Sequence, residues 1–184
     1  MGIAAYIKDI GRGKEGARSL GTEHALDLFS QVLDREVTDL EIGAFALAMR
    51  IKGETPQELI GFVQATHARC LTLDAPPASG VVVLPSYNGA RKLPNLTALL
   101  AAHLAKQGVA VLVHGPLLDP TRVTTAQVWA AMGWPIATQA ADISAHWQAG
   151  KPAFMPIDTL CHSLSSLLDV RWTIGLRNPG HTVA

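Results

Sequence analysis

Residues 81–113 read VVVLPSYNGARKLPNLTALLAAHLAKQGVAVLV, and this stretch decides the fold. The β-branched run at 81–84 is typical of a buried strand, and residues 109–113 repeat the pattern. Between the two runs, residues 96–107 have helical spacing, and Gly108 follows as a stop signal. A strand, a helix and a strand in this order predict a parallel pair joined by a right-handed crossover.

The sequence before residue 72 is typical of helices with short connections, which favour antiparallel neighbours. Gly53 is expected to end one of them. Three helix starts are predicted: Thr22 capping a helix over about 23–33, Thr38 with Glu41 as a capping box, and Thr55-Pro56-Gln57-Glu58, which combines a cap, a proline and a carboxylate.

Apolar spacing predicts which helix faces are buried. In the helix after Thr38, we expect a core stripe of Leu40, Ala44, Leu47 and Ile51, with Ile42, Phe45 and Met49 outside it as apolar surface for a partner. In the helix over 96–107, we expect His103 to share a core or interface stripe with Leu96, Leu99, Leu100 and Leu104.

The organisation along the chain predicts two domains. Residues 72–80 (TLDAPPASG) are typical of a linker, residues 153–155 are a candidate third strand, and helical spacing returns from about 159. We therefore expect a helical domain over 1–72, completed by about 159–184, and an α/β domain over 81–158. Three strands make a small sheet for a separate domain, so we expect the α/β domain to be incomplete and the chain to be part of a longer protein.

Composition sets broad limits on function. The 184 residues are 48% apolar and 16% charged, enough to bury a core. The net charge is zero and the pI is near 7.1, which excludes a globally basic nucleic-acid binder but leaves a local basic patch open. Two distant cysteines favour a reducing, cytoplasmic setting, and no apolar run has the length of a membrane span.

Several segments together resemble the YbiB-like members of the anthranilate phosphoribosyltransferase superfamily. The resemblance covers essentially the whole chain and implies a helical domain plus part of a parallel-sheet α/β domain of the class IV phosphoribosyltransferase and nucleoside phosphorylase type. It also implies a homodimer formed through the helical domain. The segments are IGRGK at 10–14, LAMRIKGET at 47–55, PSYNGARK at 85–92, NLT at 95–97, VHG at 113–115, DPTRV at 119–123, RW at 171–172, GLRN at 175–178 and HT at 181–182.

The resemblance places a phosphate-binding turn after the first strand, where the family's enzymes have several glycines. Here residues 85–92 contain one glycine, Gly89, and Tyr87 takes the place of a small residue. We expect this loop to have lost the donor site, while Asn88, Arg91 and Lys92 hold isolated phosphates of a polyanion. The alternative is an Asn-Gly turn followed by two solvated charges.

Other site residues are carried over from the same family. His114 and Gly115 match a stretch that contacts ribosyl pyrophosphate, although the family's lysine is replaced by Val113, and Arg122 is expected to return a positive charge. Arg171 matches an arginine near the acceptor's carboxylate and is expected to bind acceptor or phosphate. The family's metal-binding acidic pair would lie beyond residue 184. We therefore assign no catalytic or metal residue and no cofactor, and expect this chain alone to be inactive.

Three functions follow as hypotheses. The leading one, which the resemblance implies, is a sequence-independent binder of single-stranded nucleic acid. The alternative is a phosphoribosyl- or glycosyltransferase acting on a small aromatic or base acceptor, with Mg and phosphoribosyl pyrophosphate as cofactor and donor. The third is a dimeric scaffold whose helices bind another protein.

Overall fold

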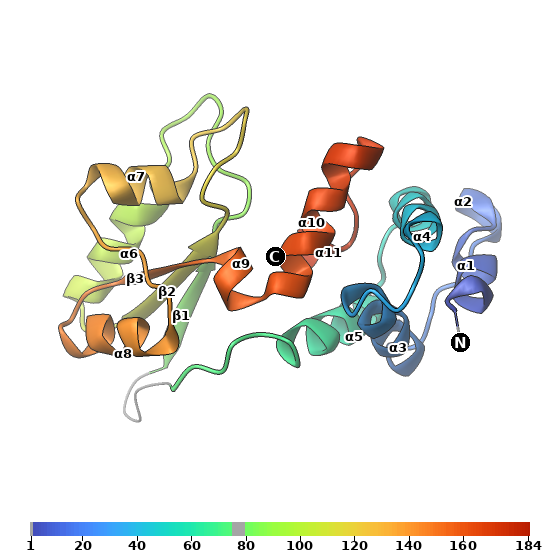
Figure 1. Ribbon diagram of the computed structural model, residues 1–184, viewed down its shortest axis with the longest axis horizontal. Coiled ribbons are helices and arrows are strands. Elements are labelled where there is room, and N and C mark those ends of the chain that lie inside the picture. Colours follow the sequence, from blue (N-terminus) through green and yellow to red (C-terminus); the bar gives the residue numbers. More distant parts are fainter. Residues whose placement is uncertain (1, 75–79) are drawn as a thin grey trace. The chain divides into compact units, whose positions relative to one another are not determined.

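The chain divides into two compact units (Figure 1). The computed structural model describes residues 2–74 and 80–184, so residues 75–79 of the predicted linker lie outside the described residues. One unit combines Met1–Cys70 with Cys161–Val183 and is helical, and the other, Leu71–Leu160, is α/β. The predicted fold class is confirmed, because a helical bundle accompanies a three-stranded parallel α/β portion.

Three phenylalanines form the centre of the helical unit. Phe29, Phe45 and Phe62 are fully buried, and the ring centroids of Phe29 and Phe62 lie 4.6 Å apart. Gly61 allows this closeness, because a Cβ there would lie 2.6 Å from the carbonyl oxygen of Thr22. The helices are α1 (Ala4–Ile10), α2 (Gly13–Gly16), α3 (Thr22–Leu33), α4 (Asp39–Lys52), α5 (Pro56–His67), α10 (His162–Ile174) and α11 (Gly180–Val183).

Two of the three predicted helix starts are confirmed. Thr38 and Thr55 each accept a hydrogen bond from the backbone of a glutamate three residues on, and each glutamate bonds back in a capping box. Thr22 was predicted wrongly. It is the first residue of α3, the cap position belongs to Gly21, and the Thr22 hydroxyl donates to the carbonyl oxygen of Gln57 at 3.2 Å. The side chain therefore joins two helices and does not cap one.

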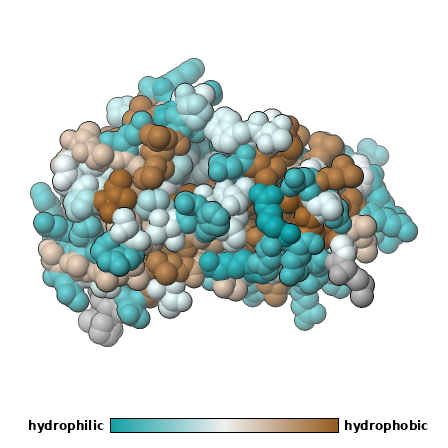
Figure 2. Space-filling view, in the orientation of Figure 1, coloured by the Kyte–Doolittle hydropathy of each residue, from teal (hydrophilic) through white to brown (hydrophobic). Residues whose placement is uncertain are grey.

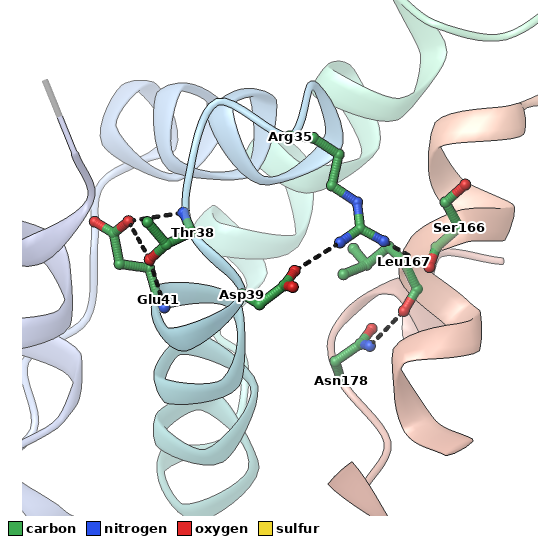
Figure 3. Close-up of polar contacts among 7 residues, drawn as sticks. All are labelled: Arg35, Thr38, Asp39, Glu41, Ser166, Leu167 and Asn178. Atoms are coloured by element: carbon green, nitrogen blue, oxygen red, sulfur yellow. Dashed lines mark hydrogen bonds and ion pairs between the residues drawn. The ribbon is translucent and has the colours of Figure 1, made fainter. Parts of the chain in front are cut away.

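The C-terminal helices bond to the N-terminal bundle, although they are far away in sequence (Figure 3). Arg35 donates to the carbonyl oxygen of Ser166 at 3.2 Å and forms an ion pair with Asp39. Asn178 is buried, and its amide donates to the carbonyl oxygen of Leu167 at 2.8 Å, which fixes the turn between α10 and α11. These bonds attach α10 to Arg35 on one side and to the segment before α11 on the other.

The α/β unit is built on a parallel sheet with the strand order β1-β2-β3. The register pairs Val81 with Ala110 and Leu112 with Ala153, so the carboxyl ends of all three strands lie at one edge. The elements are β1 (Val81–Pro85), α6 (Thr97–Lys106), β2 (Ala110–Gly115), α7 (Thr125–Ala131), α8 (Ala140–Gln148), β3 (Ala153–Pro156) and α9 (Ile157–Leu160).

Alternate residues of the buried strands pack on the two faces of the sheet. Val111, Val113 and Phe154 join a cluster with α6 and α7, which contains Trp129. Leu112, Ala153 and Met155 join a second cluster with residues of α8 and α9. Helices thus cover both faces of the sheet, as they do in α/β proteins.

The faces predicted to lie in the core were wrong for two helices, and the interface alternative for the second of them stays a prediction. In α4 the buried side includes Ile42, Phe45 and Met49, whereas the expected core stripe has Leu40 84%, Leu47 49% and Ile51 50% exposed. In α6 the small residues Ala98, Ala101 and Ala105 are buried, while the expected stripe has exposed members in Leu96, Leu99, Leu100 and His103. Both helices therefore present leucines to the surface.

Figure 2 shows that hydrophobic residues are interspersed with hydrophilic ones over the face in view. Within residues 2–74 and 80–184, no helix combines the length and the apolar character needed to cross a membrane.

Candidate functional site

The candidate site is made by the two loops that leave the carboxyl ends of β1 and β2. Residue 90 of the first loop and residue 123 of the second form an antiparallel pair: the Ala90 N–H donates to the Val123 oxygen at 2.9 Å, and the Val123 N–H donates to the Ala90 oxygen at 3.0 Å. Figure 1 shows both loops extending from the same edge of the sheet. Open α/β sheets bind ligands at this edge.

Two glycines permit the close approach of these loops. A Cβ at Gly115 would lie 2.6 Å from the carbonyl oxygen of Ser86. At Gly89, where φ is +50°, a Cβ would lie 2.8 Å from the carbonyl oxygen of Val123. Both predicted site glycines therefore have a structural reason to be glycine, which is the contact between the two loops.

A polar network that was not predicted from the sequence lies at the base of the two loops. The hydroxyls of Ser86 and Thr125 are hydrogen-bonded to each other in the interior. The Asn95 amide donates to Thr125 Oγ1 at 3.0 Å, and Asn95 Oδ1 accepts from the Thr97 N–H at 3.2 Å. The sequence singled out Ser86 and Asn95 only as members of the resemblance segments 85–92 and 95–97, because Ser86 and Thr125 meet only through tertiary packing.

A hollow of about 340 Å³ lies beside the first loop. It is lined by residues 85–90 and 94–97, which include the predicted site residues Asn88 and Gly89 and the first residue of α6. The first N–H groups of a helix have no partner within the helix and favour an anion, but at the start of α6 the Thr97 N–H already donates to Asn95 Oδ1 at 3.2 Å. Arg91 and Lys92 do not line this hollow.

Three predicted cations gather on the paired loops. Because residue 90 pairs antiparallel with 123, Arg91 and Arg122 are neighbours across the pair, and Lys92 follows. Arg91 and Lys92 are exposed, while Arg122 is half-buried and donates to the carbonyl oxygen of Asn88 at 2.9 Å. Among the described residues, none of the three forms an ion pair with an acidic side chain. The two loops therefore carry a net positive charge, with three cations against the one carboxylate of Asp119, which accepts from the Thr121 N–H and hydroxyl.

His114 is buried at the end of β2, and its backbone oxygen accepts from the Ser86 N–H at 2.8 Å. Burial lowers the pKa of His114, so the imidazole is neutral near pH 7. Its Nδ1 atom is buried without a hydrogen-bond partner among the described residues. The side chain therefore adds no positive charge to the loops.

Arg171 belongs to α10 of the helical unit, whereas the other predicted site residues belong to the α/β unit. Its guanidinium carbon lies 4.0 Å from the centroid of the Trp172 ring, a cation–π contact. In the described part of the chain, no three His, Cys, Asp or Glu side chains are grouped closely enough to hold a metal ion.

Comparison with known proteins gives a consistent set of relatives. Residues 4–70 match the helical bundle domain of a glycosyl transferase family. The uncharacterized protein YbiB of Escherichia coli is 43% identical over 185 residues, which span 100% of this chain and 58% of YbiB. The anthranilate phosphoribosyltransferase of Methylocella silvestris is 28% identical, over 91% of this chain and 48% of that protein.

A solved structure shares the fold. The anthranilate phosphoribosyltransferase of Thermus thermophilus matches 96% of this chain and 53% of its own, with a TM-score of 0.82 and 21% identity. The chain thus spans only about half the length of the enzymes that it matches.

Proposed function

Because this chain is a homologue of YbiB in the anthranilate phosphoribosyltransferase family, we propose that it uses that family's fold to bind single-stranded nucleic acid without reading sequence. The observation that carries the proposal is the gathering of Arg91, Lys92 and Arg122 on two paired loops. Contacts to phosphate give affinity without base specificity, and the exposed side chains of Arg91 and Lys92, with the half-buried Arg122 beside them, are suited to such contacts.

The charge distribution supports a local site in a chain that is neutral overall. The two paired loops hold three cations and one acidic residue, Asp119, whereas the helical unit holds most of the acidic residues, among them Glu36, Asp39, Glu41, Glu54 and Glu58, together with most of the other cations. The loop also provides Tyr87, which is half-buried at the hollow, and an aromatic side chain can stack on any base. Positive charge beside an aromatic ring is the usual combination in single-strand binders.

Titration with single-stranded DNA over a salt series tests this function. Three phosphate contacts give a log–log slope of about −2, at about −0.7 per phosphate. Replacing Arg91 and Lys92 together by alanine is expected to flatten the slope by about 1.4. The matched control replaces Lys8 and Lys14 of the helical unit by alanine and should leave the slope unchanged. An unchanged slope in the loop variant would remove this loop from the binding surface.

The second candidate function is transfer of a phosphoribosyl group, with magnesium and phosphoribosyl pyrophosphate. The hollow of about 340 Å³ at the start of α6 favours it, as does the similarity to anthranilate phosphoribosyltransferases. Against it, Pro85 removes one backbone donor from the loop, and residues 85–92 hold a single glycine. We propose that the donor site is degenerate. Calorimetry with phosphoribosyl pyrophosphate and magnesium should give no measurable heat, and micromolar affinity would reverse the order of the two candidates.

A further inference from the structure

The α/β unit has a second hollow, at the edge of the sheet opposite to the candidate site. It has a volume of about 320 Å³ and lies where α6, α7 and α8 end. Pro152, which directly precedes β3, lines it, so it adjoins the amino-terminal ends of the strands. We call it the indole pocket and define it by Ala102, Lys106, Trp129, Trp134, His146 and Lys151.

The walls of the indole pocket are mainly apolar and aromatic. Trp129 and Trp134 are packed edge to face, with centroids 4.9 Å apart, and the Trp129 N–H donates to the Pro135 oxygen at 3.0 Å. This bond fixes the wall in place, because it holds the buried indole against the turn after α7. A cavity of about 150 Å³ can hold benzene, so this pocket has room for a larger aromatic group.

The polar groups of the pocket are all suited to an anion. Lys106 and Lys151 line it, no lining residue is acidic, and neither lysine forms an ion pair within the described residues. Lys106 lies in the last turn of α6, where a cation is favourable without any ligand. His146 also lies in the last turn of its helix, α8, but that position does not explain its Nδ1 atom, which is buried with no hydrogen-bond partner among the described residues. Such an atom needs a partner, and a bound molecule would supply one.

We propose that the indole pocket binds a small aromatic carboxylate, with the ring against Trp134, beside which Trp129 is buried, and the carboxylate between Lys106 and Lys151. Small-molecule sites typically combine apolar walls with a few convergent polar groups. This site is separate from the loops that carry the proposed nucleic-acid function, so the failure of either proposal leaves the other standing.

Titration of the full chain with 2-naphthoate and with its neutral analogue 2-naphthamide tests the proposal, with indole N–H shifts in NMR as the readout. The carboxylate should bind more tightly than the amide and shift the Trp129 and Trp134 signals. Lys106→Gln and Lys151→Gln should each weaken naphthoate binding about fivefold and leave naphthamide unaffected, as expected for one charge contact. Lys14→Gln, in the other unit, is the matched control.

Ala102→Leu fills the pocket from α6 and should abolish binding of both compounds, with circular dichroism confirming the fold. The lysine variants keep the proposal testable if this variant unfolds, because they leave the core intact. Equal binding of the acid and the amide, or no binding of naphthoate, would overturn the proposal. Shifts confined to Trp172, or to Trp147 of α8, which packs in the cluster with Leu112 and Met155, would also overturn it.

Discussion

Glu58 is a fully buried carboxylate on which two helices of the bundle depend. It accepts from the Leu20 N–H at 2.9 Å and from the Lys52 ammonium at 2.6 Å, and it also closes the capping box with Thr55. Burial alone would raise the pKa of Glu58, but the bonds from Leu20, Lys52 and Thr55 outweigh it and hold the pKa below its usual value. The charged form is therefore the native one.

We expect Glu58→Gln to destabilise the protein by about 3–5 kcal/mol, because it leaves the buried ammonium of Lys52 without its counter-charge. Urea unfolding measures the loss. Lys52→Met in the same chain should restore part of the stability, since both charges are then gone. Glu41→Gln is the matched control: Glu41 closes the equivalent capping box of α4, but it is only half-buried and forms no ion pair among the described residues, so its replacement should cost far less. A similar loss in both glutamine variants would contradict the role of burial.

At the scale of the helix, α4 presents an unpartnered apolar stripe formed by Leu40, Leu47 and Ile51. These positions are seven and four residues apart, so they lie on one side of the helix. We propose that this stripe, and not Ile42, Phe45 and Met49 as expected from the sequence, is the homodimer surface of the helical unit. The latter three residues are buried within it.

Leu40→Lys combined with Leu47→Lys should convert the dimer into a monomer, as measured by light scattering at micromolar concentration. Because both side chains are exposed, the change should cost little stability. Leu99→Lys with Leu100→Lys places the same charges on the exposed side of α6 and should leave the dimer intact. A monomeric wild-type protein, or a dimer that persists in the α4 variant, would show that α4 is not the interface.

The helices illustrate what sequence can predict about single elements. Capping boxes are local, so the starts of α4 and α5 could be predicted from four residues each. Buried faces are not local: in α6 the leucines and the alanines both recur at helical spacing, and packing against β2 selected the alanines. The helix α8 was missed because its sequence, AADISAHWQ, has one fully buried apolar residue and no strong start signal.

At the scale of the whole molecule, one histidine in each unit should make stability depend on pH: His114, which is buried, and His181, which is half-buried. Burial, aided by Arg171 and Arg177, lowers the pKa of His181 from its usual 6.5 to about 4, and burial lowers that of His114. An unfolded chain takes up these protons near pH 6.5, whereas the folded chain does not. The part of the unfolding free energy that depends on keeping these two histidines neutral is therefore fully present above pH 6.5, and it is lost as the pH falls toward 4.

Urea midpoints measured between pH 8 and pH 4 should thus decline before the carboxylates titrate, because the pKa values of Asp34 and Glu58 are held low and their contribution is lost only in stronger acid. His181→Gln should flatten the decline, whereas His103→Gln, at an exposed position, should leave it unchanged. A midpoint that stays constant down to pH 4 in the wild type would contradict this assignment.

The candidate site could be predicted in outline only. Strand patterns placed the two loops after β1 and β2, and the resemblance to a known family selected their cations. The pairing of Ala90 with Val123 and the contact between Ser86 and Thr125 join residues more than thirty positions apart, which no local pattern encodes. That pairing also places Arg91 and Lys92 outside the hollow. Their position relative to the hollow could therefore be seen only in the folded chain.

The helical unit is interrupted in sequence by the whole α/β unit, and this order matters during synthesis. A ribosome releases α3 and α5 first, but α10, which supplies the Ser166 oxygen to Arg35, follows the α/β unit of about 90 residues. At roughly 5–20 residues per second, the nascent bundle waits about 5–18 seconds for its last helices. Until then the bundle exposes the surface that α10 and α11 later cover. The nascent chain therefore passes through a stage in which a chaperone can bind this exposed surface.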